Sequence, residues 1–251
     1  MAQSKPELPY DSPSFRSSKF MLIVEILAVF ALGMVVLLGC IGALGSGVFV
    51  SVIAIWCANL TMLTGIYWGL RSRGQGWRHF GLSHRILELK SIGIIVLQSI
   101  PVCIVSLLAF IVGAVVMANI VGMPEPADMS KYDYLRGNLG LTLVALVSVY
   151  FVSSFAEEVI YRGFLVTRLI ELGGDQMLWR CVAIVFSSLV FGLVHSDWGV
   201  AGMVQASFMG VALGVSYLVV RRELWVTIFA HAYMDTLLIL QMYMPTVDSG
   251  S

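Results

Sequence analysis

Seven apolar runs, each long enough to cross a lipid bilayer, take up most of this chain of 251 residues. A membrane-spanning helix needs about 20 predominantly apolar residues. Only 12% of the residues are charged and 59% are hydrophobic, whereas soluble domains carry about 25% charged residues. The sequence therefore predicts an all-α fold, a polytopic transmembrane helical bundle of about seven spans. We place the spans near residues 20–42, 46–70, 93–121, 141–166, 178–196, 201–220 and 224–244.

Composition divides the chain into four segments. Residues 1–19 are polar and contain three prolines, so we expect a disordered cytosolic tail. Residues 20–139 are expected to form N-terminal transmembrane helices, residues 140–244 a helical core that carries the chemistry, and residues 245–251 a C-terminal tail. The formal net charge is zero, so no nucleic-acid partner is expected. The four cysteines lie in apolar runs without CxxC spacing, which favours neither disulfides nor a cysteine zinc site.

Lysine and arginine are distributed unevenly between the two sides of this seven-span arrangement. Alternate segments carry 13 of these cations on one side and 2 on the other, which accounts for all 15. Cytoplasmic loops of membrane proteins carry an excess of lysine and arginine. We therefore expect a multi-pass protein of the cell membrane with a cytosolic N-terminus and an extracytoplasmic C-terminus.

Three charged residues, Glu157, Glu158 and Arg162, interrupt one of the apolar runs. A charge at bilayer depth costs a few kcal/mol or more, so by default it marks a functional site. Glu158 and Arg162 are four residues apart and share one face of a helix, which predicts a pair. Glu157 is rotated off that face and is left free for chemistry. The alternative is a buried ion pair that only holds two helices together.

Two further polar motifs lie in later apolar runs: Phe191-Gly-Leu-Val-His195 and His231-Ala-Tyr-Met-Asp235. His231 and Asp235 are one helical turn apart, so both can reach the same point. A lone histidine in a membrane helix is more often an interhelical hydrogen-bonding group than a catalyst. Because two histidines accompany several carboxylates and an arginine, we expect the three motifs to converge on one polar site.

Helix lengths give a test of this convergence. Gly173 and Gly174 form a plausible helix end, and Asp175 a plausible N-cap of the next helix. Counted from this turn at 1.5 Å per residue, Glu157 and His195 differ in depth by about 6 Å. His231 is expected deeper toward the cytosol than His195, an offset that a non-helical stretch at residues 196–199 could absorb.

Two other segments carry packing and surface expectations. Residues 71–85 mix cations with aromatic residues, so we expect this linker at the level of the lipid headgroups. Ala206, Gly210 and Gly214 recur at four-residue intervals, a pattern that favours close helix packing.

Taken in order, Glu157-Glu158-x-x-x-Arg162, Phe191-x-x-x-His195 and His231-x-x-x-Asp235 resemble the motifs of the CPBP family of intramembrane proteases. That family includes CAAX-type prenyl-protein endopeptidases and bacteriocin-processing or self-immunity proteins. The resemblance covers about residues 140–240. It departs from the family pattern at Asp235, where the family more usually has asparagine.

The resemblance implies an endopeptidase that hydrolyses a peptide bond in a membrane-anchored or lipidated peptide or protein. By similarity, Glu157 and His195 would activate the water, while His231 and Asp235 would lie near the developing oxyanion. An ionised Asp235 only accepts hydrogen bonds, so it is either protonated, or orients His231, or helps to bind a metal. Glu157, His195, His231 and Asp235 are therefore also candidate ligands of a divalent metal such as Zn²⁺. The sequence leaves the metal-dependent and metal-free mechanisms open.

Two non-enzymatic classes compete with this interpretation. A proton-coupled transporter would be expected to show an internal repeat with interrupted helices, and the sequence shows none. A membrane immunity or scaffold protein remains an alternative, although an inactive relative would be expected to lose several motif positions and only one is altered here.

Overall fold

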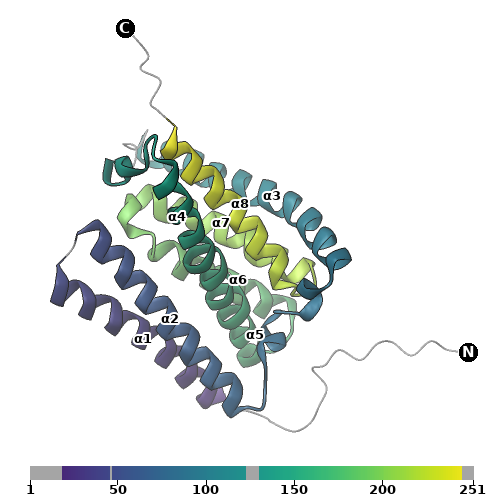
Figure 1. Cartoon of the computed structure of the whole chain (residues 1–251). Helices are drawn as coiled ribbons and strands as arrows, with labels where there is room; N and C mark the ends of the chain where they lie inside the picture. Colours follow the sequence, from purple (N-terminus) through teal and green to yellow (C-terminus); the bar gives the residue numbers. More distant parts are fainter. Residues whose placement is uncertain (1–18, 46, 123–129, 245–251) are drawn as a thin grey trace, which may run out of the picture.

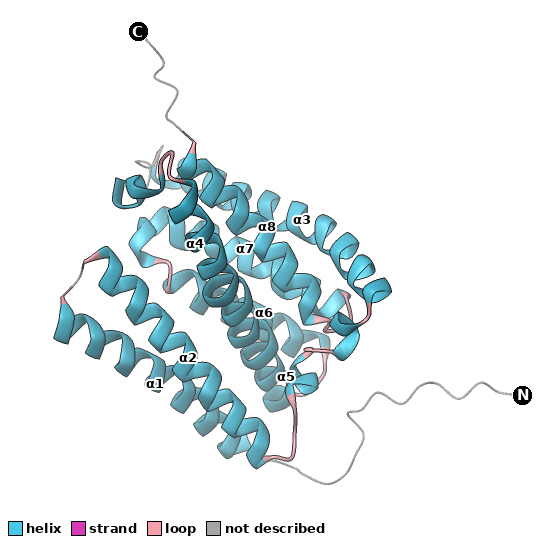
Figure 2. Cartoon of the chain, in the orientation of Figure 1, coloured by secondary structure: helices cyan, strands magenta, loops and turns pink. Residues whose placement is uncertain are grey.

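Helices and short helical turns make up the regular structure of the described residues, with no strand among them (Figure 2). The computed structural model describes residues 19–45, 47–122 and 130–244. The all-α prediction is therefore confirmed for this part of the chain. Except for Lys19, which begins the first helix, the tail expected at residues 1–19 lies outside the described residues, as does the tail expected at 245–251.

Seven helical passes follow one another along the described chain. Six of them are long and apolar enough to cross a membrane, and the seventh, α6, is apolar but shorter. The prediction of about seven spans is thus confirmed. The helices are α1 (Lys19–Leu44), α2 (Val48–Ser72), α3 (Leu89–Val121), α4 (Leu139–Val149), α5 (Thr167–Gly173), α6 (Met177–Leu193), α7 (Gly199–Val219) and α8 (Leu224–Tyr243).

The fourth pass, Leu139–Gly173, lies at the centre of the bundle. Figure 1 shows it between the α1–α2 hairpin and the group formed by α3, α7 and α8. Its middle is not a regular α-helix. Two π-helical segments, η4 (Tyr150–Phe155) and η5 (Glu158–Val166), separate α4 from α5.

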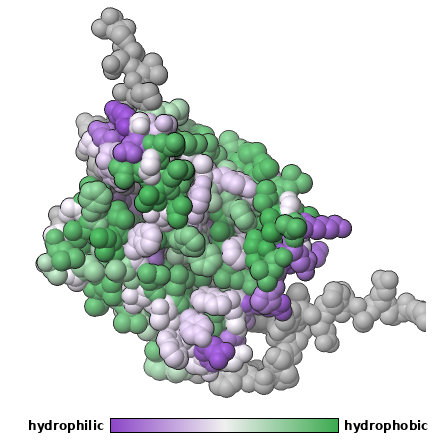
Figure 3. All heavy atoms as spheres, in the orientation of Figure 1, coloured by the Kyte–Doolittle hydropathy of each residue, from purple (hydrophilic) through white to green (hydrophobic). Residues whose placement is uncertain are grey.

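Apolar side chains cover most of the face in Figure 3, and hydrophilic side chains gather toward the ends of the bundle. Large hydrophobic side chains such as Leu27 and Leu97 are more than 60% exposed. Contiguous apolar surface of this extent on a folded protein marks contact with a membrane or a partner. This surface agrees with the span lengths in indicating a bilayer environment.

The connection between the fourth pass and α6 confirms one expectation and corrects another. The helix ends at Gly173, and Gly174 has φ = 95°, a left-handed value that favours glycine. Asp175 is not the N-cap of α6, because Gln176 holds that position and makes no side-chain capping bond. Asp175 instead accepts two hydrogen bonds of 2.8 Å from Arg180. The Asp175 carboxylate therefore pairs with the guanidinium of Arg180 and not with the free backbone N–H groups at the start of α6.

The linker between α2 and α3 is anchored in the bundle. It contains two 3₁₀ turns, η1 (Trp77–Phe80) and η2 (His84–Leu87). Phe80 is fully buried, packs edge-on against Phe164, and lies under the guanidinium of Arg168. The linker predicted at the headgroup surface is therefore anchored in the bundle by one of its aromatic side chains, because Phe80 packs against Phe164.

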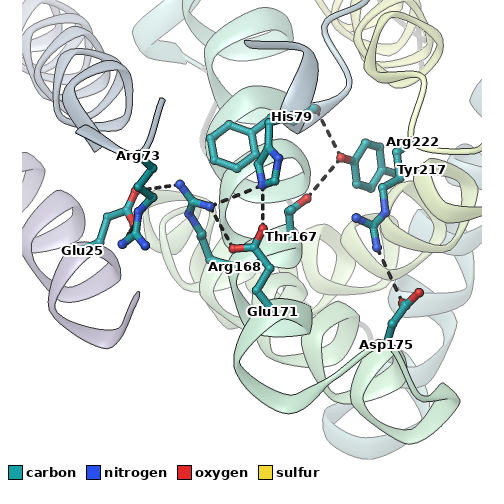
Figure 4. A network of polar contacts seen from close by, with 10 residues as sticks. Glu25, Arg73, His79, Thr167, Arg168, Glu171, Asp175, Tyr217 and Arg222 are labelled. Atoms are coloured by element: carbon teal, nitrogen blue, oxygen red, sulfur yellow. Dashed lines mark hydrogen bonds and ion pairs between the residues drawn. The ribbon is translucent and has the colours of Figure 1, made fainter. Parts of the chain in front are cut away.

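A polar network ties the α1–α2 hairpin to the end of the fourth pass (Figure 4). The carboxylate of Glu25 in α1 accepts hydrogen bonds from Arg73 at 2.6 Å and from Arg168 at 3.1 Å. Arg168 also donates to Glu171 at 2.8 Å, and Glu171 contacts His79 of the linker at 2.6 Å. Arg168 is completely buried, so these contacts compensate a charge that would otherwise be costly inside the protein.

The small residues of α7 allow close contact with α6, as their spacing predicted. A Cβ atom added at Gly210 would lie 3.0 Å from Cβ of Ser188. A Cβ atom added at Gly214 would lie 3.0 Å from Cγ2 of Ile184. Larger side chains at these positions would push α6 and α7 apart, which would also displace the histidine that follows α6.

Candidate active site

Glu157 sits at the junction between the two π-helical segments of the fourth pass. Segment η4 ends at Phe155 and segment η5 begins at Glu158. π-Helical turns are rare inside α-helices and often occur at functional sites. Apolar periodicity does not predict this feature, because an uninterrupted apolar run is compatible with α-helical and π-helical turns alike.

Glu158 and Arg162 form the ion pair that their spacing predicted. The two side chains are 0% and 2% exposed, and Nη1 of Arg162 donates to Oε1 of Glu158 at 2.7 Å. The guanidinium carbon of Arg162 also lies 4.2 Å from the centre of the Phe191 ring in α6. This cation–π contact joins the fourth pass to the second motif.

His231 extends the pair to α8. Its Nδ1 lies 3.1 Å from Oε1 of Glu158, and it is the donor there, since a carboxylate accepts. Its Nε2 lies 3.8 Å from Oδ1 of Asp235, one turn further along α8. The carboxylates of Glu158 and Asp235 therefore flank the imidazole, and the predicted common face of His231 and Asp235 is confirmed.

Ser154 was not predicted as a site residue. Its hydroxyl donates to Oδ2 of Asp235 at 2.7 Å, and the side chain is buried. Four residues separate Ser154 from Glu158, as four separate Glu158 from Arg162. This spacing places Ser154 on the same helix face as Glu158, and it is the sequence feature that could have predicted Ser154 as a site residue.

Glu157 differs from Glu158 in making no hydrogen bond to another described residue, whereas Oε1 of Glu158 accepts two. Oε2 of Glu157 is buried and has no hydrogen-bond partner among the described residues. The carboxylate nevertheless lies within electrostatic range of Arg162, His231 and Asp235. The sequence prediction that Glu157 stays free of the arginine hydrogen bond is confirmed.

His195 reaches the same region through the Phe191 ring. The ring centre of Phe191 lies 4.7 Å from that of His195 and 6.1 Å from that of His231. His231 thus contacts a residue one helical turn before His195, in agreement with the expected offset in depth. The chain leaves α-helical geometry after Leu193 and passes through a 3₁₀ turn, η6 (Ser196–Trp198), near the predicted break.

The hydrogen bond made by His195 uses Nδ1 of its ring and leaves Nε2 without a hydrogen-bond partner among the described residues. Nδ1 lies 2.8 Å from the carbonyl oxygen of Phe191, so Nδ1 carries the proton and donates. In the neutral ring, Nε2 then has a lone pair available to a water molecule or a substrate. No hydrogen bond joins His195 to Glu157 in the described part of the chain, so their pairing around a water stays a prediction.

The four candidate metal ligands do not form a ligand group in this conformation. Within residues 19–45, 47–122 and 130–244, no cluster of three or more His, Cys, Asp or Glu side chains is spaced to hold a metal ion. Nδ1 of His231 and Nδ1 of His195 are both used in hydrogen bonds inside the protein. The donor set as arranged therefore does not fit a zinc centre.

The comparisons with known proteins bear on this arrangement. No curated protein and no solved structure matches the chain. Residues 139–237 match the model of the family described as type II CAAX prenyl endopeptidase Rce1-like. The matched segment begins at the start of the fourth pass and ends just after Asp235, so it contains all three motifs. This match confirms the resemblance to the CPBP proteases for residues 139–237, which are similar to the Rce1-like type II CAAX prenyl endopeptidases.

Proposed function

We propose that the chain is an intramembrane endopeptidase that hydrolyses a peptide bond in a membrane-anchored or lipidated peptide or protein. The observation that carries the proposal is the contrast between two adjacent glutamates. Oε1 of Glu158 accepts hydrogen bonds from Arg162 and His231, whereas Glu157 makes no hydrogen bond to another described residue and its Oε2 is buried. A carboxylate that no neighbouring side chain occupies, beside a fixed polar network, is available to act as a general base.

The first step that these residues support is activation of water. Glu157 takes a proton from the water, and the resulting hydroxide attacks the carbonyl carbon of the scissile peptide bond. Nε2 of His195 accepts the second hydrogen of the same water and orients it. The proton held by Glu157 then passes to the leaving nitrogen as the C–N bond breaks.

The second step is stabilisation of the oxyanion that forms on the carbonyl. When His231 is doubly protonated, one N–H points to Glu158 and the other lies on the side of Asp235. Such an imidazolium stabilises the negative charge of the tetrahedral intermediate. Asp235 is held by Ser154 and lies 3.8 Å from the ring, which supports a positioning role for this unusual residue.

The proposal is tested with the purified full-length protein in liposomes and a membrane-anchored fluorogenic peptide, with and without a prenyl group. Cleavage by the wild type and none by Glu157→Gln is expected. The same assay with a chelator separates the two mechanisms, because loss of activity with chelator and its return with Zn²⁺ would establish a metal. Binding of the peptide without cleavage by either protein would favour an immunity or scaffold function.

We also propose that the protein lies in the cell membrane with its N-terminus in the cytosol. Gly76 follows α2 and Arg136 precedes α4, and both are exposed. These residues lie at opposite ends of the bundle, because Phe49 at the start of α2 packs against Tyr134. In a cysteine-free background, an impermeant reagent applied to intact cells should label Arg136→Cys and leave Gly76→Cys unlabelled. The reverse pattern would overturn the orientation.

A further inference from the structure

A cavity of about 430 Å³ opens at one end of the bundle, away from the three motifs. It lies between the first part of α3 and the turn from α7 to α8. None of its lining residues belongs to the candidate active site. The lining residues are Arg85, Gln98, Val219, Val220, Arg221 and Glu223.

The turn that borders this cavity is held in an unusual backbone conformation. Arg221 and Arg222 have φ angles of 57° and 61°, in the left-handed region that residues with a Cβ atom rarely adopt. The backbone N–H of Arg222 donates to the carbonyl of Tyr217 at 2.7 Å. The N–H of Leu224 donates to the carbonyl of Gly81 at 3.0 Å, which fixes the turn against the linker. These hydrogen bonds hold the backbone of the turn at Arg221, so this side of the cavity is fixed.

The charges in the cavity leave one cation unpaired. The carboxylate of Glu223 is 10% exposed, accepts the Ser83 hydroxyl at 2.9 Å, and lies 3.5 Å from Nη1 of Arg85. Arg221 is exposed, and no carboxylate of the described residues pairs with it. Arg85 and Glu223 compensate each other, so the excess charge is positive and located at Arg221.

Exposed apolar side chains flank the same place. Leu87 at the end of η2 and Leu89 at the start of α3 are 78% and 89% exposed, and Val219 at the end of α7 is 74% exposed. Candidate membrane spans begin at Leu89 and end at Val219, so this cavity lies where spans meet the interface. A cationic site at the interface with apolar side chains beside it matches the chemistry of a phospholipid, whose phosphate lies at the interface and whose chains lie in the bilayer.

We propose that this cavity binds the phosphate of an anionic phospholipid, with Arg221 as the main cationic contact and the apolar residues beside the acyl chains. Helix α8 begins at Leu224, immediately after the turn, and reaches His231 seven residues later, about 10 Å along the helix. A lipid bound here would stabilise the start of the helix that carries His231. The proposal does not depend on peptidase activity.

The test measures lipid binding to the purified full-length protein in a neutral detergent, by thermal shift and by mass spectrometry of the intact complex. The probes are phosphatidylglycerol, phosphatidylcholine and inorganic phosphate. Arg221→Gly removes the cation at a backbone angle that glycine tolerates, so the fold should be retained. Arg221→Lys keeps the charge. Arg78→Gln is the matched control, because Arg78 is an exposed cation of the linker that does not line the cavity.

Phosphatidylglycerol should bind more tightly than phosphatidylcholine. Arg221→Gly should weaken its binding about fivefold, while Arg221→Lys and Arg78→Gln change it by less than about twofold. Equal loss in Arg78→Gln would show diffuse attraction to the protein surface and would overturn the proposal. So would equal binding of phosphatidylcholine, or an equal shift with inorganic phosphate, which would indicate a site for free anions.

Discussion

Glu157→Gln and Glu158→Gln are isosteric changes at adjacent positions, and the contacts of the two carboxylates predict different outcomes. Glu158 is completely buried and accepts from Arg162 at 2.7 Å and from His231 at 3.1 Å. Replacing it with glutamine leaves the guanidinium of Arg162 buried without its hydrogen-bonded anion. Removing one partner of a buried ion pair costs about 3–5 kcal/mol. Arg162 keeps its contact with Phe191 at 4.2 Å, so we expect the lower end of this range, about 3 kcal/mol.

Glu157→Gln should cost much less free energy of unfolding. No hydrogen bond is lost at Oε2, because that atom has no partner in the described structure. Removal of a buried charge also makes burial easier. We expect a change of less than about 1 kcal/mol, together with complete loss of cleavage because the general base is gone.

Thermal unfolding in detergent and cleavage of a membrane-anchored peptide separate the two effects. A loss of about 3 kcal/mol corresponds to a drop of about 6–12 °C in Tm for a chain of this size. Glu158→Gln should therefore melt early, and Glu157→Gln should melt like the wild type. Glu157→Asp and Glu158→Asp serve as charge-preserving controls. A stable but inactive Glu158→Gln, beside an active Glu157→Gln, would refute the assignment of roles.

Three further outcomes follow from individual contacts. Ser154→Ala removes the 2.7 Å hydrogen bond to Asp235, so it should cost about 1 kcal/mol and slow cleavage without abolishing it, as single-turnover rates would show. Arg168→Met removes the buried cation shared by Glu25 and Glu171 and should lower stability by about 3 kcal/mol in equilibrium unfolding. Hydrogen bonds from Arg180 lower the pKa of Asp175 in the folded protein. The contribution of Asp175 to folding stability is therefore fully present above its unfolded-state pKa of about 4 and is lost as the pH falls through its lower folded-state pKa. Asp175→Asn should accordingly destabilise slightly at neutral pH and not at low pH, as melting curves at the two pH values would test.

The features that the sequence predicted well depend on spacing within one helix. Glu158 with Arg162, and His231 with Asp235, are four residues apart, and helical geometry alone places such pairs on one face. The span positions follow equally directly from long apolar runs. The helix end at Gly173 and Gly174 could be predicted because glycine tolerates the left-handed backbone conformation that often ends a helix, and Gly174 adopts it with φ = 95°.

The features that the sequence did not predict depend on contacts between helices. Ser154 meets Asp235 across 81 positions, and Phe80 of the linker is buried against Phe164. Nothing in the local sequence of either partner specifies the other, since the partner is set by how whole helices pack. Asp175 shows the same limit at short range. Its carboxylate could accept from the backbone N–H groups at the start of α6 or from Arg180, and it accepts from Arg180.

The π-helical segments explain why Ser154, Glu158 and Arg162 form one stripe of polar side chains along the fourth pass. In an α-helix of 3.6 residues per turn, four residues advance about 400°, so Ser154, Glu158 and Arg162 would drift by about 80° from first to last. A π-helical turn closes its hydrogen bond five residues along instead of four, so each residue advances less. Segments η4 and η5 contain these three residues and reduce the drift, which keeps them aligned. The stripe then meets His231 and Asp235 of α8 along its length, while Glu157, one residue off the stripe, keeps a carboxylate oxygen free for a water molecule.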